Sequence, residues 1–494
     1  MKPREGILAI DFGTSNVRAA LINVENGSIL GNESAKYEWM HPEEGQTEIN
    51  PHEIWRASQR TVWDLLKKCG GNIGIAGIGF SFFGDNVIPV DENGNELSNL
   101  LPAFDSRSRK EVEIFSKEIG PEKFIEITGG CLTTMCVGTK ILWLRNNRKD
   151  VFDKARCFFD IQQYILNKLG LPSLNDFTMA SRKMLYDVNE GVFSDLLLDV
   201  IGIDDKMLGE GVAQSSSVVG AIRAYGDVEL PHEIMVALGA HDAECGLFGL
   251  GVHPKGGTAL GDNMGTFDHI GCFTDHFFNT CSIEPSLYSY CGPDRSTFAV
   301  QGGVPTGGAL LEWFASSVYQ KKGKGVFDDL FGFVQFDGTG DLMMLPGFGA
   351  SEGCIVGLNL SDNLYSIFRS IIEGISFETK MAVDDFNKLF ENRFDCVRAG
   401  GGGAKSAKWL QLKANVTGKR VEKVANIEVS CLGAAIIAST GMRMHGDFQQ
   451  AIKEMVCVDQ VFLPDEMIHE RYSKKEDKHI SLKKCLKGYF SHTL

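Results

Sequence analysis

The sequence lacks the two glycine-rich loops by which many nucleotide-binding proteins hold phosphates. Neither G-x-x-x-x-G-K-[ST] nor G-x-G-x-x-G occurs in its 494 residues. A nucleotide site in this chain therefore cannot be a Walker loop or a Rossmann loop. Its phosphates would need another set of backbone amides and hydroxyl groups.

Positive charge is also in deficit, because 49 lysines and arginines face 64 aspartates and glutamates, which gives a formal net charge of −15. This balance argues against nucleic acid as the main partner, since a phosphate backbone needs clustered Lys and Arg. An acidic protein can still bind ATP through backbone amides and a divalent cation.

Long apolar runs and paired cysteines are missing as well. The apolar run at 434–438 is too short to span a bilayer and predicts a buried helix. No signal-length apolar stretch follows the charged N-terminus, and none of the 13 cysteines forms a Cys-x-x-Cys pair. We expect a cytoplasmic protein with reduced thiols, no membrane partner, and neither a disulfide framework nor a zinc site.

Proline is scarce and glycine abundant, at 14 and 56 residues, and 43% of the chain is hydrophobic. This composition is typical of a globular protein, and the length exceeds what one ordinary core organises. Strand-like segments alternate with helical patterns, such as a helix expected at 51–68 and a buried strand expected at 73–83. The alternation predicts an α/β fold, with domains at 1–250 and 251–440 and a C-terminal helical appendage at 441–494.

Asp11 ends a strand-like segment and is followed by the tight turn Gly13-Thr14-Ser15. The glycine lets the backbone approach a ligand closely, and the N–H groups and hydroxyls of Thr14 and Ser15 can hold phosphate oxygens. Asp11 could hold Mg²⁺ through the water shell of the ion. A plain hairpin with a polar tip explains the same residues.

The second half of the chain repeats this pattern. Asp262 lies in another strand-like segment about half a chain later, and Gly265-Thr266 follows it. A repeat at half the chain length suggests two related domains, each of which offers a Gly-Thr turn to a shared cleft.

Asp242 stands between an apolar strand at 234–238 and a helix rich in small residues. A carboxylate at a strand end is where a general base could meet a substrate hydroxyl, and phosphoryl transfer needs little beyond such a base, positioning and charge neutralisation. The alternative role is a helix N-cap, which is frequent for aspartate. We expect His241 to be packed or hydrogen-bonded, because no second histidine lies at metal-ligand spacing.

Four successive glycines, Gly400 to Gly403, end a strand-like stretch and precede a helical run at 409–416. Such a run lets a flat ring or a phosphate approach the backbone closely. The alternative is a flexible linker, which is disfavoured because ordered apolar segments hold the run on both sides.

In this order the sites resemble those of the FGGY carbohydrate kinases of the actin-like ATPase superfamily, and the resemblance covers nearly the whole chain. Residues 11–18 and 261–266 are similar to the two phosphate motifs, and 239–251 resembles the segment that carries the catalytic aspartate. The adenosine motif resembles 400–418 followed by 432–435. Further matching stretches are 140–144, 178–182, 307–313 and 373–375.

The resemblance implies two actin-like (ribonuclease H-like) α/β domains with an interdomain catalytic cleft for ATP and a sugar. It implies that Asp242 binds the substrate hydroxyl and takes its proton, that Asp11 orients Mg²⁺, and that ATP donates the phosphoryl group. The residues implied for the nucleotide are Thr14, Ser15, Asn16, Gly265, Thr266, Gly308, Glu312, Gly402, Gly403 and Ser406.

On the substrate side the resemblance implies Asp85, Asp105 and Arg107. Glycerol kinases carry an Arg-Glu pair, and xylulose kinases a Met-His pair, where this chain has Gly84-Asp85. Ala103 stands where glycerol kinases place Trp, and Met135 replaces an expected aromatic residue, so we expect no glycerol-sized aromatic clamp. We infer that the acceptor is a larger or differently shaped polyol or ketose.

Two other functions fit an actin-like ATP site. A non-catalytic sugar sensor or regulator would bind ATP without phosphorylating a sugar, and an actin-like enzyme of another branch, such as an acetate kinase, would use ATP on a different acceptor. Retention of Asp242 together with both Gly-Thr turns favours the carbohydrate kinase over the sensor. The adenosine segment disfavours the acetate kinase. A homodimer is the usual outcome in the family.

Overall fold

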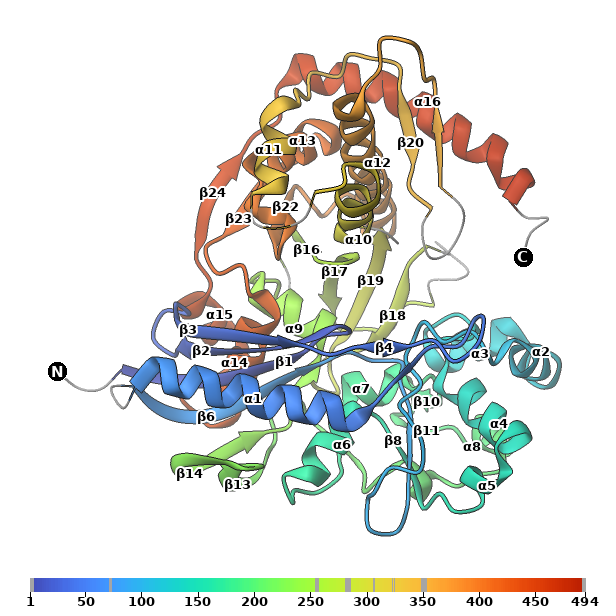
Figure 1. The fold of residues 1–494 in the computed structure, drawn as a ribbon, viewed down its shortest axis with the longest axis vertical. Coiled ribbons are helices and arrows are strands. Elements are labelled where there is room, and N and C mark those ends of the chain that lie inside the picture. Colours follow the sequence, from blue (N-terminus) through green and yellow to red (C-terminus); the bar gives the residue numbers. More distant parts are fainter. Residues whose placement is uncertain are drawn as a thin grey trace. The chain divides into compact units, whose positions relative to one another are not determined.

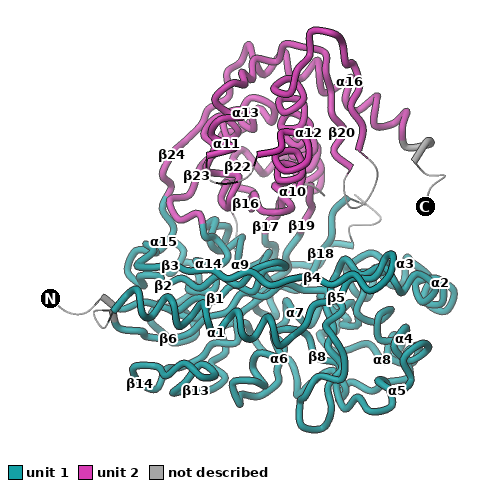
Figure 2. The backbone as a smooth tube through the Cα atoms, in the orientation of Figure 1, with its two compact units in different colours: residues 1–256, 273–300, 428–457 teal, residues 257–272, 301–427, 458–494 magenta. Residues whose placement is uncertain are grey.

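The structure is a computed structural model that describes residues 4–70, 73–253, 257–279, 286–304, 307–321, 323, 325–347 and 353–490. The chain forms two compact units, neither of which is continuous in sequence (Figure 2). Unit 1 comprises Met1–Gly256, Phe273–Val300 and Glu428–Cys457, and unit 2 comprises Gly257–Cys272, Gln301–Ile427 and Val458–Leu494. The domains expected from the sequence, at 1–250, 251–440 and 441–494, are continuous segments and stay a prediction.

Unit 1 is built on a seven-stranded sheet in the order β13-β14-β6-β1-β2-β3 (Figure 1). The seventh strand, β15, also pairs with β6. Its strands are β1 (Arg4–Phe12), β2 (Asn16–Asn23), β3 (Ile29–Lys36), β6 (Ile73–Phe82), β13 (Val218–Tyr225), β14 (Val228–Ala237) and β15 (Ala240–His241). β1 pairs antiparallel with β2 and parallel with β6. Since β1, β6 and β15 are parallel, the residues at their carboxyl ends meet at one end of the sheet.

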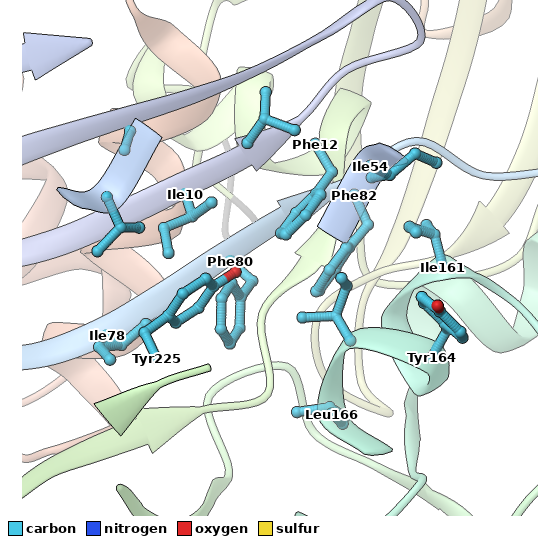
Figure 3. Close-up of a cluster of buried hydrophobic side chains, with 14 of the residues drawn as sticks. Ile10, Phe12, Ile54, Ile78, Phe80, Phe82, Ile161, Tyr164, Leu166 and Tyr225 are labelled. Carbon is cyan, nitrogen blue, oxygen red and sulfur yellow. The ribbon is translucent and has the colours of Figure 1, made fainter. Parts of the chain in front are cut away.

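Strand β6 shows why helices cover both faces of this sheet. Successive strand residues point to opposite faces, and Phe80 and Phe82 join a buried cluster with Ile54 of α1 (Pro51–Cys69) (Figure 3). Gly79 points the other way, and a Cβ there would lie 2.4 Å from the carbonyl oxygen of Ala434 in α14 (Val429–Gly441). The two helices therefore pack on opposite faces, and α14 approaches closely because β6 has a glycine at the contact.

The segment at 109–201 of unit 1 is mainly helical and has a second buried core, which includes Phe115, Phe124, Ile141 and Leu197. The helices of unit 1 after α1 are α2 (Arg109–Glu118), α3 (Pro121–Thr128), α4 (Val137–Asn147), α5 (Lys149–Phe152), α6 (Ile161–Lys168), α7 (Phe177–Arg182), α8 (Asp195–Ile201), α9 (Asp242–Gly249), α14 and α15 (Phe448–Met455). Short strand pairs join β4 (Trp39–Met40) to β5 (Glu48–Ile49), β7 (Ile88–Val90) to β8 (Cys157–Phe159), β9 (Asn175–Asp176) to β12 (Val212–Ala213) and β10 (Tyr186–Asp187) to β11 (Val192–Phe193).

A second seven-stranded sheet has the order β18-β19-β17-β16-β22-β23-β24, and its strands β16, β22, β23 and β24 lie wholly in unit 2. The strands are β16 (Ala259–Met264), β17 (Asp268–Thr274), β18 (Tyr288–Cys291), β19 (Phe298–Val304), β22 (Cys396–Gly400), β23 (Arg420–Val424) and β24 (Val458–Phe462). A separate pair is formed by β20 (Met343–Leu345) and β21 (Cys354–Val356). The helices are α10 (Gly308–Trp313), α11 (Val326–Phe333), α12 (Leu364–Leu389), α13 (Ala407–Thr417) and α16 (Glu466–Phe490).

Both sheets contain the same arrangement at corresponding places. In the first sheet β1 turns into its antiparallel neighbour β2 and pairs on its other side with the parallel strand β6. In the second, β16 turns into antiparallel β17 and pairs on its other side with parallel β22. The repeated Gly-Thr dipeptides of the sequence thus lie in equivalent strand-turn-strand segments.

The last fifty residues are divided between the two units. α15 belongs to unit 1, whereas β24 pairs with β23 and α16 belongs to unit 2. α16 is fixed by buried contacts, because Tyr472 Oη donates to Glu373 Oε1 at 2.9 Å and Lys475 Nζ donates to Glu373 Oε2 at 2.6 Å. These residues therefore contribute a sheet strand and core contacts in addition to helices.

The alternation of strands and helices predicted from the sequence is confirmed. None of the helices in the described part of the chain combines the length and the apolar character that crossing a bilayer requires. Every cysteine in the described ranges is a free thiol.

Candidate active site

Asp11 lies one residue before the end of β1, between β2 and β6. The pairing register sets it opposite Arg18 on one side and Ser81 on the other. Arg18 Nη1 donates to Asp11 Oδ2 at 3.1 Å, and Ser81 Oγ donates to Oδ1 at 2.7 Å. Only 3% of Asp11 is exposed. Strand pairing therefore fixes a buried, hydrogen-bonded carboxylate at this end of the sheet.

The turn between β1 and β2 is held by two aromatic side chains. Tyr37 Oη donates to the carbonyl of Gly13, and Trp39 Nε1 donates to the carbonyl of Thr14 at 2.6 Å. Two carbonyls of the turn are thus satisfied within the protein. The predicted nucleotide contacts of this turn are Thr14 and Asn16, which are half-buried, and Ser15, which is exposed.

Asp242 is the first residue of α9, at the same end of the sheet. The N-cap position, which the sequence left open for Asp242, belongs to His241. The Asp242 side chain is 30% exposed, whereas those of His241 and Glu244 are 5% and 0% exposed. Burial raises the pKa of Asp242 to about 6; a charge on His241 and the charge of Arg182 lower it, whereas the negative charges of Asp11 and Glu244 raise it. The site therefore has one accessible carboxyl group that titrates near neutral pH.

Asp242 is next to a buried group of polar residues, which consists of His241, Glu244 and Arg182. His241 Nδ1 is 2.7 Å from Glu244 Oε2, and His241 Nε2 is 3.4 Å from Asp242 Oδ1. Arg182 Nη2 is 4.0 Å from Glu244 Oε1, and the Arg182 guanidinium stands 4.0 Å from the ring centre of Tyr290. Burial, together with the charge of Arg182, lowers the pKa of His241 to about 4. The imidazole is therefore uncharged at neutral pH.

Asp85 has a strained backbone conformation near this group. Its φ is +57°, in the left-handed region that residues other than glycine seldom adopt. The residue is 7% exposed, and no described residue donates a hydrogen bond to its Oδ1. Backbone strain persists mainly at functional sites, and buried polar atoms are nearly always paired. Asp85 is thus a predicted substrate residue with hydrogen-bonding capacity left for a ligand.

The side chains of Asp105 and Arg107 are buried and paired with each other. Arg107 Nε lies 2.8 Å from both carboxylate oxygens of Asp105, and the N–H of Thr47 donates to Asp105 Oδ2 at 2.7 Å. The other end of Arg107 contacts Glu48 Oε1 at 2.9 Å and stacks 4.9 Å from the ring centre of Trp143. The pair forms a rigid structural connection, and its contact with a substrate stays a prediction.

In unit 2 the turn between β16 and β17 is closed by the start of α10. The N–H of Gly308 donates to the carbonyl of Gly265 at 2.9 Å, and that of Ala309 donates to the carbonyl of Thr266 at 3.1 Å. A Cβ at position 308 would lie 2.8 Å from the Gly265 carbonyl oxygen, so the close approach requires glycine. The Thr266 residue is exposed. The fold thus brings together three residues that the sequence analysis assigned to the nucleotide.

The glycine run after β22 packs beside β16. Gly401 has a φ of +81°, and a Cβ there would lie 2.9 Å from Asn263 Oδ1. A Cβ at Gly403 would lie 2.9 Å from the ring of Trp409, whereas at Gly402 the nearest atom would be 4.0 Å away. Gly401 and Gly403 therefore permit close packing within unit 2, and Gly402 leaves its exposed backbone open to a ligand.

The two remaining predicted nucleotide residues lie on helices of unit 2. Ser406 is the N-cap of α13, where its Oγ accepts a hydrogen bond from the N–H of Trp409 at 3.3 Å. Its hydroxyl proton can still be donated to another acceptor. Glu312 is exposed on α10. Both positions are compatible with a ligand contact.

A buried group of three charged side chains stabilises the turn between β16 and β17 in unit 2. Lys413 Nζ lies 2.5 Å from Asp262 Oδ2 and 2.9 Å from Asp268 Oδ2, and all three side chains are 0% exposed. Burial raises the pKa of Asp268 to about 6, although the charge of Lys413 opposes this. Asp262 lies in β16 and Asp268 begins β17. Lys413 of α13 therefore forms ion pairs with both strands that flank the turn.

The sequence analysis missed three groups that organise these sites, namely Ser81, Glu244 and Lys413. The spacing of three residues between His241 and Glu244 at a helix start could have indicated their contact, because residues three apart on a helix are neighbours. Ser81 and Lys413 meet their partners through strand register and helix packing, which leave no local pattern in the sequence.

Comparison with known protein families matches most of the chain. The FGGY family of carbohydrate kinases, N-terminal domain, matches residues 6–249. The FGGY family of carbohydrate kinases, C-terminal domain, matches residues 285–442. Asp11, Asp85 and Asp242 fall within the first match, and Gly308 and Gly402 fall within the second.

Individual relatives agree with this match over nearly their full length. A glycerol kinase from Halothermothrix orenii is 26% identical over 479 residues, which cover 93% of this chain and 94% of that protein. The structure of a ligand-bound xylulose kinase from Lactobacillus acidophilus has a TM-score of 0.85 at 23% identity and covers 99% of this chain and 100% of its own. Plasmodium falciparum glycerol kinase with ADP has a TM-score of 0.80 at 20% identity, with 97% and 98% covered. The predicted two-domain α/β fold is confirmed.

Proposed function

The chain belongs to the FGGY family of carbohydrate kinases, and we propose that it uses Asp242 as the general base for phosphoryl transfer from Mg-ATP to a hydroxyl of a sugar, ketose or polyol. The observation that carries this proposal is the partial exposure of Asp242 together with its raised pKa. Asp242 is the most accessible member of a buried polar group, with 30% of its side chain exposed, and its pKa is raised to about 6. A base with a pKa near neutral pH is well matched to proton transfer from a hydroxyl group.

The proposed step is an in-line displacement at the γ-phosphorus of ATP. The acceptor oxygen forms a bond to phosphorus while the bond between phosphorus and the leaving oxygen of ADP breaks, and the hydroxyl proton passes to Asp242. Apart from this base, the protein contributes to phosphoryl transfer mainly by positioning the reactants and stabilising charge. The phosphorylated acceptor and ADP are the products.

Asp11 fits a magnesium ion that arrives with ATP. Mg²⁺ keeps several waters and is held by one or two carboxylates together with phosphates. Each oxygen of Asp11 accepts one hydrogen bond, from Arg18 or from Ser81, and retains lone-pair capacity for a metal-bound water. The ion would supply charge neutralisation at the phosphates. In this proposal Arg18 and Ser81 hold Asp11 in its orientation.

The two Gly-Thr turns and the glycine run fit the parts of ATP. Exposed hydroxyls and backbone amides at the turns suit phosphate oxygens, and the open backbone at Gly402 suits the flat adenine ring. The residues assigned to ATP in unit 1 are Thr14, Ser15 and Asn16, and those in unit 2 are Gly265, Thr266, Gly308, Glu312, Gly402, Gly403 and Ser406.

The acceptor is proposed to be a polyol or ketose larger than glycerol, bound through Asp85 with Asp105 and Arg107 behind it. A coupled assay of ADP release over pentuloses, hexuloses, aldonates and polyols tests this. We expect one compound class to stimulate ATP consumption and to yield a phosphorylated product in mass spectrometry. ATP binding with no stimulation by any member of the panel would instead support a sugar sensor that does not catalyse transfer.

Asp85→Ala is expected to raise KM for the acceptor by about 10–100-fold, the scale of a lost hydrogen bond to a charged group, and to leave KM for ATP nearly unchanged. Steady-state kinetics with the acceptor found above would measure both constants. Because alanine is strained at the φ of +57°, Asp85→Asn serves as a companion that tolerates this backbone and removes only the charge. Wild-type kinetics in both variants would remove Asp85 from the pocket.

The pH dependence of kcat/KM should show an acidic limb with an apparent pKa of about 6, set by Asp242. The sign follows from the role of a base: the ionised form is active, so activity falls about tenfold per pH unit below this value and is full above it. Initial rates from pH 4.5 to 8 at constant ionic strength would measure the limb. A limb near pH 4, the usual range of aspartate, would contradict the raised pKa.

A further inference from the structure

His241 lies between two carboxyl groups of the candidate site. Its Nδ1 is 2.7 Å from Glu244 Oε2, and its Nε2 is 3.4 Å from Asp242 Oδ1. The backbone N–H of His241 donates to Thr178 Oγ1 at 2.8 Å, which holds the backbone of His241 in place. Only 4% of His241 is exposed, and its ring connects buried Glu244 to partly exposed Asp242.

The space for this ring depends on Gly84. A Cβ at that position would lie 2.7 Å from Cδ2 and 2.8 Å from Nε2 of His241, so any larger residue would displace the imidazole. Gly84 and His241 are therefore two parts of one packing arrangement, in which the Nε2 edge of the ring lies beside Asp242.

The contact with Glu244 decides which nitrogen carries the proton. An ionised carboxylate only accepts hydrogen bonds, and Arg182 Nη2 stands 4.0 Å from the other Glu244 oxygen, which favours the ionised form. The Ala243 N–H also points to Nδ1, at 3.3 Å, but the 2.7 Å contact with Glu244 is much shorter. We therefore assign the Nδ1 proton to the contact with Glu244, which leaves Nε2 of the neutral ring as an acceptor. The charged and titratable groups that face His241 and Asp242 are Asp11 of β1, Asp85, Arg182 of α7 and Glu244 of α9.

We propose that His241, oriented by Glu244, is a positioning residue for Asp242, whose protonated form donates a hydrogen bond to His241 Nε2. The inference rests on the proposed function of Asp242 as general base. When the acceptor oxygen bonds to the γ-phosphorus, its proton passes to an oxygen of Asp242, and the resulting carboxylic acid O–H points to Nε2. No further group is oxidised, reduced or consumed. His241 thereby stabilises the proton-bearing form that Asp242 must reach during the reaction.

Glu244→Gln is the first test, because it keeps the size of the side chain and changes the group that faces His241 Nδ1, although it also removes the charge beside Arg182. The Gln amide can donate to Nδ1, which shifts the ring proton to Nε2 and turns it into a donor toward ionised Asp242. We expect kcat to fall about tenfold, KM for ATP to stay unchanged, and the acidic limb of kcat/KM to move to lower pH. The Glu244 charge itself also raises the pKa of Asp242, so this shift counts for the positioning role only when His241→Asn, which keeps Glu244, moves the limb in the same direction.

His241→Asn is the second variant, in case loss of the Glu244 charge beside Arg182 impairs folding. Asparagine can still reach Glu244 but has no group at the position of Nε2, so the acidic limb is again expected to move to lower pH. The matched control is Glu111→Gln, another buried glutamate of unit 1 that contacts Asn146 and should leave the pH profile unchanged. Circular dichroism and thermal unfolding would confirm that each variant is folded.

Two results would overturn the positioning role. An unchanged acidic limb in folded Glu244→Gln and His241→Asn would show that His241 does not act on Asp242. A limb that moves to higher pH in His241→Asn would show that Nε2 donates to Asp242, the reverse of the assigned proton position. Asp242→Asn separates these outcomes from failure of the proposed function, because wild-type turnover in that variant would remove Asp242 as the base whatever His241 does.

Discussion

Asp242→Asn should lower kcat for phosphorylation of the acceptor by about 10²–10⁴-fold, the usual effect of losing a positioned general base, while ATP binding persists. The amide of asparagine has the shape of the carboxylate but does not accept a proton at neutral pH. The nucleotide contacts proposed here involve other residues, so the affinity for ATP should change little. Calorimetric titration with a non-hydrolysable ATP analogue would measure binding, and ADP release with the acceptor would measure turnover.

A matched control for this variant is Asp195→Asn. Asp195 is also the first residue of a helix in unit 1, α8, and it is exposed. The control therefore removes a carboxylate with the same favourable position at a helix N-terminus, without touching the candidate site. Wild-type turnover in Asp242→Asn would refute the general-base role, and loss of ATP affinity together with turnover would point instead to damage of the fold.

Lys413→Met should destabilise unit 2 by about 3–5 kcal/mol, the usual cost of removing one partner from a buried ion pair. Burial lowers the pKa of Lys413, but Asp262 and Asp268 outweigh this effect and raise it, so the ammonium is charged between the two carboxylates. Its removal leaves two buried carboxylates without a counterion. For a unit of this size the expected fall in the midpoint of thermal unfolding is roughly 6–20 °C, measurable by calorimetry.

The exposed lysine Lys474 of α16 provides the control for this prediction, since Lys474→Met should shift the midpoint little. The penalty of Lys413→Met should also shrink as the pH falls from 7 to 5. The sign follows from Asp268, whose pKa is already raised to about 6: a raised pKa in the folded state means that protonation favours folding. A Lys413→Met protein as stable as the wild type at pH 7 would show that this buried group of three charged side chains is dispensable.

Local patterns in the sequence predicted the elements well where one short segment contains all the information. The helix expected at 51–68 forms as Pro51–Cys69, and the strand expected at 73–83 forms as Ile73–Phe82. Proline at the first helical turn and a continuous apolar run act through the nearest neighbours in the chain, so their effect can be read without the fold. The apolar run at 434–438 likewise lies in the buried helix α14.

The partners of the polar side chains were less predictable. Asp11 was recognised as a strand-end carboxylate, but its hydrogen bond with Ser81 depends on the parallel register of β1 and β6. Asp105 and Arg107 were assigned to the substrate, and the fold pairs them with each other and with Thr47. His241 was expected to be packed or hydrogen-bonded; it is both, and only the structure identifies Glu244 as its partner.

The sequence by itself determined the α/β alternation, the family and the positions of the chemical groups, because these depend on short motifs in a fixed order. The tertiary structure decided which groups meet. It joined residues 428–457 to unit 1, brought Lys413 to Asp262 and Asp268, and set His241 in the space left by Gly84. The physical reason is burial: a charge removed from water must find a counterion or a hydrogen bond, and only the packing of distant segments determines which partner is within reach.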